Sequence, residues 1–135
     1  MYEQVYENRP VSALRLLGKA LDRLVLAEDG RVAWTVVTQA MLRETGATME
    51  ESEGIIGELR ALGGVEVAVL FKEEPDGIRV SLRARGRVRA HVIAEAFGGG
   101  GHAAAAGFTG RAPLDDLVRR ALEIVGRELS AASDA

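Results

Sequence analysis

Two segments of alternating apolar and polar residues, joined by a short turn, constrain the fold of this chain more than any other feature. Residues 65–72 read VEVAVLFK, and residues 77–85 read GIRVSLRAR. A period of two is typical of strands that bury one face, because successive side chains point to opposite sides of a sheet. Pro75-Asp76-Gly77 lies between them and favours a tight turn, since proline presets φ and glycine accepts a positive φ. The pattern therefore predicts a β-hairpin.

Other segments have the spacing of helices and of further strands. Apolar residues recur every three or four positions over 14–25 and 114–129, which predicts helices opened by Pro10 and Pro113. We also predict strands over 31–37 and 105–109, a turn at 28–30 that ends the first helix, helices after Thr38 and Thr48, a helix over about 89–97, and a frayed tail over 130–135. The fold class is α/β (α+β): a small mixed β-sheet of about four to five strands with helices packed on it, preceded by a linker helix.

The composition narrows the chemistry that the chain can support. Its 135 residues suit one domain and include no cysteine and only two histidines, His91 and His102, with a net charge of -3. These counts exclude a disulfide framework, a thiolate zinc site, a cysteine nucleophile and any site that needs three imidazoles. No apolar run approaches the roughly 20 residues of a membrane span, so we expect a cytoplasmic protein with no membrane partner.

Arginines gather in one strand although the chain is acidic overall. On the predicted strand over 77–85, Arg79, Ser81, Arg83 and Arg85 share one side, and no acidic residue occurs over 77–94. Guanidinium groups suit phosphate oxygens and also stack on bases, which makes these residues candidates for nucleotide binding. The alternative is a solvated outer face of an edge strand, where charged residues oppose aggregation.

The second candidate site is a run of glycines followed by a histidine. Four consecutive glycines, Gly98, Gly99, Gly100 and Gly101, precede His102, although one glycine would be enough to end a helix. The others make sense if the backbone approaches a ligand closely, or if several N–H groups converge on an anion. The alternative is a flexible linker, which the packed small residues of AAAAGF that follow do not favour. No catalytic residue and no metal site are predicted within this chain.

The run VSLRARGRVRAHVIAEAFGGGGHAAAAGF resembles the DHHA1 domain of the DHH phosphoesterase superfamily. The most specific elements are GGGGHAAAAG, which is similar to the family's GGGH-x-x-A-A-G signature, and the serine-x-arginine strand before it. Within the superfamily, the chain looks most like the bacterial bifunctional oligoribonuclease and pAp phosphatases. The resemblance implies that Arg83 and His102 contact the substrate and its phosphate, and that Gly99, Gly100 and Gly101 form the loop that receives the nucleotide.

The resemblance also implies a two-domain enzyme. In that family a DHH domain holds two divalent metals, usually manganese, and activates water, while the DHHA1 domain holds the terminal nucleotide. Nothing in this chain matches the DHH triad. We therefore expect residues 1–29 to be the tail of a missing N-terminal DHH catalytic domain with a linker helix, and residues 30–135 to be a DHHA1-like substrate-binding domain.

Three functional readings stay open at this point. The first is a substrate-binding domain whose ligand is a short single-stranded RNA or DNA or a nucleotide phosphate. The preferred substrate could then be an oligoribonucleotide, pAp, a cyclic dinucleotide or DNA. The second is a stand-alone nucleic-acid-binding module like the DHHA1 domains of RecJ-type exonucleases or alanyl-tRNA synthetases. The third is an assembly domain that forms a homodimer through the apolar stripe over residues 14–25.

Overall fold

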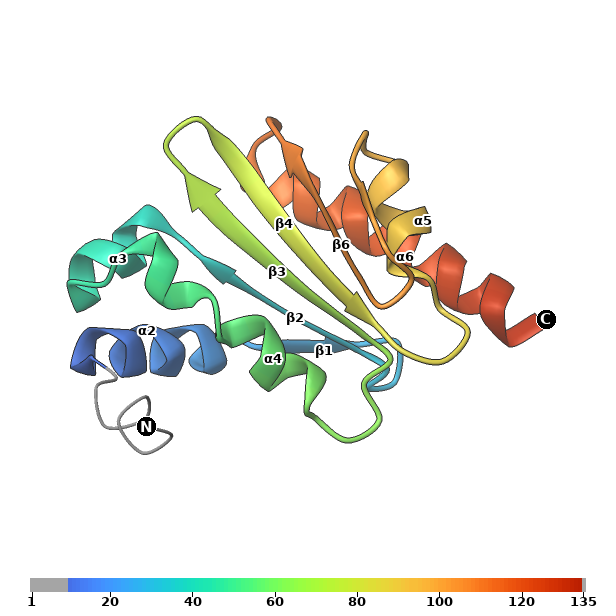
Figure 1. Cartoon of the computed structure of the whole chain (residues 1–135), viewed down its shortest axis with the longest axis horizontal. Coiled ribbons are helices and arrows are strands. Elements are labelled where there is room, and N and C mark those ends of the chain that lie inside the picture. Colours follow the sequence, from blue (N-terminus) through green and yellow to red (C-terminus); the bar gives the residue numbers. More distant parts are fainter. Residues whose placement is uncertain (1–9, 135) are drawn as a thin grey trace.

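The computed structural model describes residues 10–134, so the expectations for residues 1–9 lie outside the described residues. A mixed sheet of six strands, in the order β1-β2-β3-β4-β6-β5, forms the centre of the described part and carries helices on both faces (Figure 1). The strands are β1 (Val25–Ala27), β2 (Val32–Val37), β3 (Val67–Glu74), β4 (Gly77–Ala84), β5 (Gly100–Gly101) and β6 (Ala105–Gly110). The helices are α2 (Val11–Asp22), α3 (Gln39–Thr45), the 3₁₀ turn η1 (Met49–Ser52), α4 (Ile55–Arg60), α5 (Ala90–Glu95) and α6 (Leu114–Asp134).

The predicted hairpin and the predicted fold class are both confirmed. β3 and β4 pair antiparallel along their whole lengths, from Val67↔Ala84 to Glu74↔Gly77. β2 and β3 are parallel, and the connection between them carries α3, η1 and α4, which is why the sheet is mixed. The turn differs from the prediction in one detail. The sequence predicts a positive φ for Gly77 within the turn, but Gly77 is the first residue of β4 and its φ is not positive. A side chain there would instead press on β6, with its Cβ 3.3 Å from the Gly110 carbonyl oxygen.

The sheet has six strands, more than the four to five predicted, because it includes two short strands, β1 and β5, that the sequence pattern does not indicate. β5 consists of two glycines, which give no side-chain pattern. β1 falls in the segment assigned to the first helix, which ends at Asp22 in the structure. Pairing of Val25 with Trp34 draws residues 25–27 onto the edge of the sheet, and the turn at 28–30 therefore joins β1 to β2 and does not end a helix.

Two further helix boundaries differ from the prediction. The single helix expected after Thr48 is divided into η1 and α4, with Gly54 between them. α6 continues to Asp134, through the predicted frayed tail, because Leu129 is buried and holds its last turns on the sheet. Thr38 begins α3 as predicted, with its hydroxyl accepting a hydrogen bond from the Met41 N–H, and Gly46 ends the helix at a φ of +73°.

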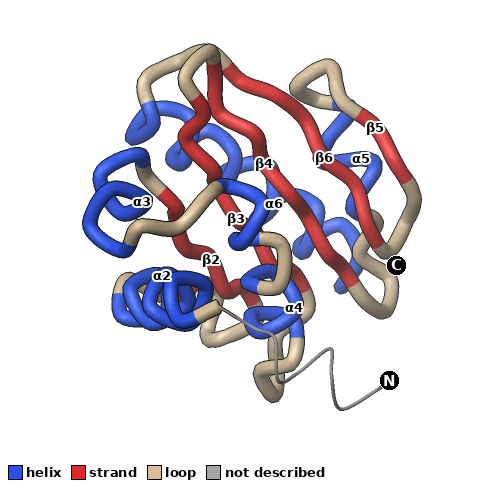
Figure 2. The backbone as a smooth tube through the Cα atoms, turned by 60° about the vertical axis from the view of Figure 1, so that its left-hand side comes forward, coloured by secondary structure: helices blue, strands red, loops and turns tan. Residues whose placement is uncertain are grey.

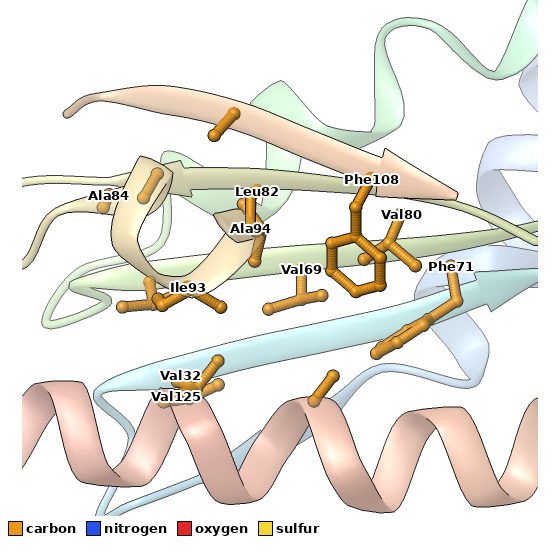
Figure 3. Close-up of a cluster of buried hydrophobic side chains, with 14 of the residues drawn as sticks. Val32, Val69, Phe71, Val80, Leu82, Ala84, Ile93, Ala94, Phe108 and Val125 are labelled. Atoms are coloured by element: carbon orange, nitrogen blue, oxygen red, sulfur yellow. The ribbon is translucent and has the colours of Figure 1, made fainter. Parts of the chain in front are cut away.

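Each face of the sheet has its own hydrophobic core. On one face, Phe71, Val80 and Leu82 pack beneath α5 and α6 (Figure 3). On the other, Ala68 and Leu70 pack beneath α2, α3 and α4. The side chains of β3 over 67–71 are all buried, because this strand is covered on both faces.

α2 is packed into the second of these cores. Its buried side is formed by Ala13, Leu16 and Ala20, which is offset from the predicted stripe, so that Leu14 and Leu21 are exposed. The buried Thr35 hydroxyl on β2 donates a 2.6 Å hydrogen bond to the Ala20 carbonyl oxygen and fastens the end of α2 to the sheet. The domain boundary after residue 29 and the homodimer remain predictions.

Glu51 ties the beginning of α2 to η1 and makes stability depend on pH. The Ser12 hydroxyl donates a 2.6 Å hydrogen bond to its carboxylate, and the Thr48 N–H donates another at 3.1 Å. These bonds favour the charged form and lower the pKa of Glu51 below its ordinary value of 4.5. The contact therefore adds stability above the ordinary pKa, and this stability is lost as the pH falls towards the lowered value.

We expect Glu51→Gln to reduce the thermal midpoint at neutral pH and to converge on the wild type in acid, because a protonated carboxyl resembles an amide. Thermal unfolding followed by circular dichroism between neutral pH and about pH 3 measures this difference. Glu58→Gln, on the exposed side of α4, is the matched control. A constant offset between Glu51→Gln and wild type at every pH would contradict the assignment.

Candidate functional site

Half of the sheet is left uncovered on the face that carries α2, α3 and α4. In Figure 2 these helices lie towards β2 and β3, whereas β6 and β5 have no helix in front of them. The side chains on this part of the sheet are small or basic, and together we call them the open face. It consists of Arg79, Ser81 and Arg83 of β4, Ala105, Gly107 and Thr109 of β6, and Gly100 of β5.

The strand register arranges the open face in three rows. Arg79 lies opposite Thr109, and Arg83 lies opposite Ala105. Between them, Ser81 lies opposite Gly107, which pairs in turn with Gly100. The central row therefore has almost no side chain above the backbone, and an arginine stands on each side of it.

The structure adds residues to this face that the sequence did not point to. Lys72 pairs with Arg79 across β3 and β4 and extends that row by another cation. Gly107 and Thr109 come from β6, which was predicted as a strand but without a register. Only the pairing of β6 with β4 brings them to the arginines, and no local pattern in the sequence indicates that pairing.

The two arginines of the open face lack a neutralising carboxylate. Neither Arg79 nor Arg83 forms an ion pair with any carboxylate of residues 10–134. Arg83 is half-buried, and its Nη1 donates a 2.9 Å hydrogen bond to the Leu82 carbonyl oxygen. This bond holds one side of the guanidinium and leaves its other N–H groups available to an anion.

Arg85 is separated from the other two arginines. Its Nη2 donates a hydrogen bond to the carbonyl oxygen of Arg60, the last residue of α4. Carbonyl groups at the end of a helix lack partners within the helix and attract cations, so this contact stabilises α4. Arg85 also lines a small hollow with Gly57 and Ala61 at that end of the sheet.

Packing against β6 accounts for two of the four glycines that precede His102. A Cβ on Gly99 would lie 2.2 Å from the Gly107 carbonyl oxygen, and a Cβ on Gly101 would lie 2.6 Å from that of Ala105. Gly98 has a φ of +81°, which explains a third glycine. Gly100 has open space around its Cβ position and an ordinary φ, so here the backbone can be approached from outside.

His102 stands in the turn between β5 and β6, and its side chain is exposed. Its N–H donates a 2.8 Å hydrogen bond to the Ala105 carbonyl oxygen. The N–H groups of Gly98 and Gly99 likewise bond to carbonyl groups of α5. The backbone N–H groups of His102, Gly98 and Gly99 thus donate to carbonyl oxygens of the chain itself and are not directed at an anion. The turn reaches the end of β4 through a 3.0 Å bond from the Ala84 N–H to the Ala104 carbonyl oxygen, which brings His102 to the Arg83 end of the open face.

The open face is a surface and not an enclosed pocket. A hollow of about 540 Å³ lies elsewhere, between Trp34 and Val118 at the opposite edge of the sheet. Among residues 10–134, no group of three His, Cys, Asp or Glu side chains could hold a metal ion. None of the described helices has the length and apolar character needed to cross a membrane.

Two curated relatives are named bifunctional oligoribonuclease and PAP phosphatase NrnA. The protein from Thermus thermophilus is 37% identical over 92% of this chain and 37% of its own length. The protein from Bacillus subtilis is 32% identical over 79% of this chain and 33% of its own length. The chain therefore spans about a third of the length of these relatives.

A solved structure and a family model agree with these relatives. The crystal structure of an exopolyphosphatase-related protein from Bacteroides fragilis matches 96% of this chain and 37% of its own, with a TM-score of 0.81 and 24% identity, which shows a shared fold. The model of the DHHA1 domain matches residues 17–131. On this match, the chain belongs to the DHHA1 domain family.

Proposed function

We propose that the chain is the substrate-binding domain of a longer DHH-type phosphoesterase that hydrolyses short oligonucleotides or pAp in the cytoplasm. The names of the two curated relatives support the substrate class. The observation that carries the proposal is the open face, where Arg79 and Arg83 lack carboxylate partners beside a row of small residues. Such a surface is suited to a phosphate group and to the flat parts of a nucleotide.

In this proposal each residue of the open face has its own role. Arg83, held by the Leu82 carbonyl group, donates to the terminal phosphate, and His102 donates from the adjoining turn. Ser81 adds a hydroxyl between the arginines, and Gly100 lets the ligand approach the backbone of β5. Arg85, which is bound to α4, remains at the margin.

The proposed reaction also needs a second domain. The donor groups for a metal are missing from residues 10–134, so we place the divalent metal ions (manganese is the expected one) in a DHH domain within the remaining length of the whole protein. That domain would close over the open face and activate the attacking water. The 135-residue chain by itself is expected to bind the ligand weakly and to hydrolyse nothing.

We expect Arg83→Ala to weaken binding of a 5′-phosphorylated RNA dinucleotide by about 10- to 100-fold, because a hydrogen bond between charged groups contributes roughly 1.5–3 kcal/mol. Fluorescence anisotropy with the labelled dinucleotide measures this effect. Arg127→Ala, an exposed arginine on α6, is the matched control and should leave the affinity unchanged. Equal affinities of Arg83→Ala and wild type would contradict the proposal.

Two further measurements separate a terminal-nucleotide site from a long nucleic-acid track. A site with one or two phosphate contacts predicts a logarithmic salt slope of about -0.7 to -1.4 for single strands. It also predicts nearly the same affinity for a dimer and a decamer. A steep slope and an affinity that rises with length would support a stand-alone nucleic-acid-binding module instead. Turnover of RNA by the 135-residue chain with manganese would refute the assignment of catalysis to another domain.

A further inference from the structure

The guanidinium of Arg79 lies across the neighbouring strand. A Cβ built on Gly107 would meet Nη2 of Arg79 at 2.7 Å and Cζ at 3.1 Å. The C–N bonds of a guanidinium are roughly 1.3 Å long, so an end-on approach of Nη2 would place Cζ about 4 Å away. Cζ is nearer than this, and neither of the other two guanidinium nitrogens is as near as Cζ, so the group lies broadside over the Cβ position of Gly107 and thus flat on β6. Gly107 makes this contact possible, because any side chain would displace the guanidinium.

The other side of the guanidinium is turned away from β6. Arg79 is exposed, and it makes no hydrogen bond or ion pair with any described residue. The guanidinium covers Gly107, which is buried, and beside it on the central row lie Ser81 and Gly100, where nothing larger than a serine rises from the sheet. The guanidinium of Arg79 is therefore supported by β6 on one of its flat sides, and its other flat side is accessible to a planar group such as a base.

The described aromatic residues are on the opposite side of the sheet. Phe71 and Phe108 belong to the core beneath α5 and α6, and Trp34 and Phe97 pack against that core. Proteins that bind single-stranded nucleic acids stack bases on aromatic rings, and an arginine plane serves the same purpose. On this face Arg79 is the residue with the geometry for stacking.

We propose that Arg79 is the stacking platform for the base of the bound nucleotide, while Arg83 and His102 take its phosphate. This inference rests on the proposed function and assigns a different part of the ligand to each arginine, the base to Arg79 and the phosphate to Arg83. Stacking does not depend on which base is present, so the site should accept all four bases, with purines bound more tightly because their rings are larger. Gly107 is a positioning residue in this arrangement, since it keeps the guanidinium flat on β6.

The test compares two ligands that differ only by a base, adenosine 5′-monophosphate and ribose 5-phosphate. We expect the wild-type chain to bind the nucleotide about 5- to 100-fold more tightly, in line with measured contributions of stacking on a protein side chain. In Arg79→Lys this ratio should fall towards one, because the charge is kept and the plane is lost. The affinity for ribose 5-phosphate should stay within about twofold, as should the salt dependence of binding. Calorimetric titration or NMR shift titration of the whole chain measures both affinities.

Gly107→Ala provides a second and independent variant. The methyl group should lift the guanidinium from β6 and lower the same ratio, and because it also approaches the Val80 carbonyl oxygen at 2.9 Å we expect some loss of stability as well. Gly18→Ala on α2, where nothing lies within 4 Å of an added Cβ, is the matched control and should leave the ratio unchanged. Wild-type protein that binds both ligands equally would overturn the stacking role and leave the proposed function standing. Equal losses for both ligands in Arg79→Lys would show that Arg79 holds the phosphate. Wild-type protein that binds neither ligand would overturn the proposed function itself.

Discussion

Gly99→Ala is expected to destabilise the chain by about 3 kcal/mol or more, as overpacking does where the backbone cannot move away. The added Cβ would lie 2.2 Å from the Gly107 carbonyl oxygen and 2.5 Å from Cβ of Phe108. Both atoms belong to β6, which is held by pairing with β4 on its other side. Relief would need the 98–101 segment to leave the sheet, with loss of β5.

Gly100→Ala is the matched control, since nothing lies within 4 Å of a Cβ at that position and its φ is ordinary. We expect it to change the free energy of unfolding by less than about 1 kcal/mol. Urea denaturation of both variants, followed by circular dichroism, compares them directly. Similar losses at Gly99 and Gly100 would mean that this segment does not pack on β6 in the way described.

Phe108→Ala should cost about 3–5 kcal/mol, the usual range for removing a fully buried aromatic ring. Phe108 is 1% exposed and stacks on Phe97 with ring centroids 4.4 Å apart. Its ring lies in the core beside Val80 (Figure 3), on the side of β6 that faces away from the open face. The cavity left by the ring would lie in a core built from β4, α5 and α6. Because these are separate elements, they cannot all shift to fill it.

Phe97→Ala is the comparison for this second prediction. Phe97 is only half-buried, and its outer side is covered by the Arg120 guanidinium at 5.8 Å. The loss should be clearly smaller than that at Phe108, because less apolar surface is returned to water. Thermal unfolding of the two variants ranks them, and the reverse order would contradict the deeper burial of Phe108.

Local patterns in the sequence predicted much of this fold. Alternation placed Ile78 and Val80 on one side of β4 and Arg79 and Arg83 on the other, because side-chain direction in a strand depends only on the chain itself. Thr38 began a helix as expected, since its hydroxyl bonds to an N–H three residues on. The hairpin followed for the same reason, as its two strands are neighbours in sequence.

Features that depend on distant partners could not be predicted in this way. β1 exists because Val25 pairs with Trp34, although the same residues also fit a helical period. The neighbourhood of Arg79 and Gly107 depends on the register between β4 and β6, which are separated by α5 and β5. Arg85 was grouped with the other arginines by alternation, and its contact with Arg60 became visible only once α4 was placed.

The uneven covering of the sheet has a consequence for how such a domain can change over evolutionary time. β4 and β6 keep their buried side chains on one face and their exposed ones on the other. Replacing an exposed residue such as Arg79 or Thr109 leaves the core intact, and surface substitutions of this kind usually alter stability by no more than about 0.5 kcal/mol. Substitutions on the open face can therefore accumulate one at a time without passing through unfolded intermediates, so the chemistry of this surface can change while the scaffold stays the same.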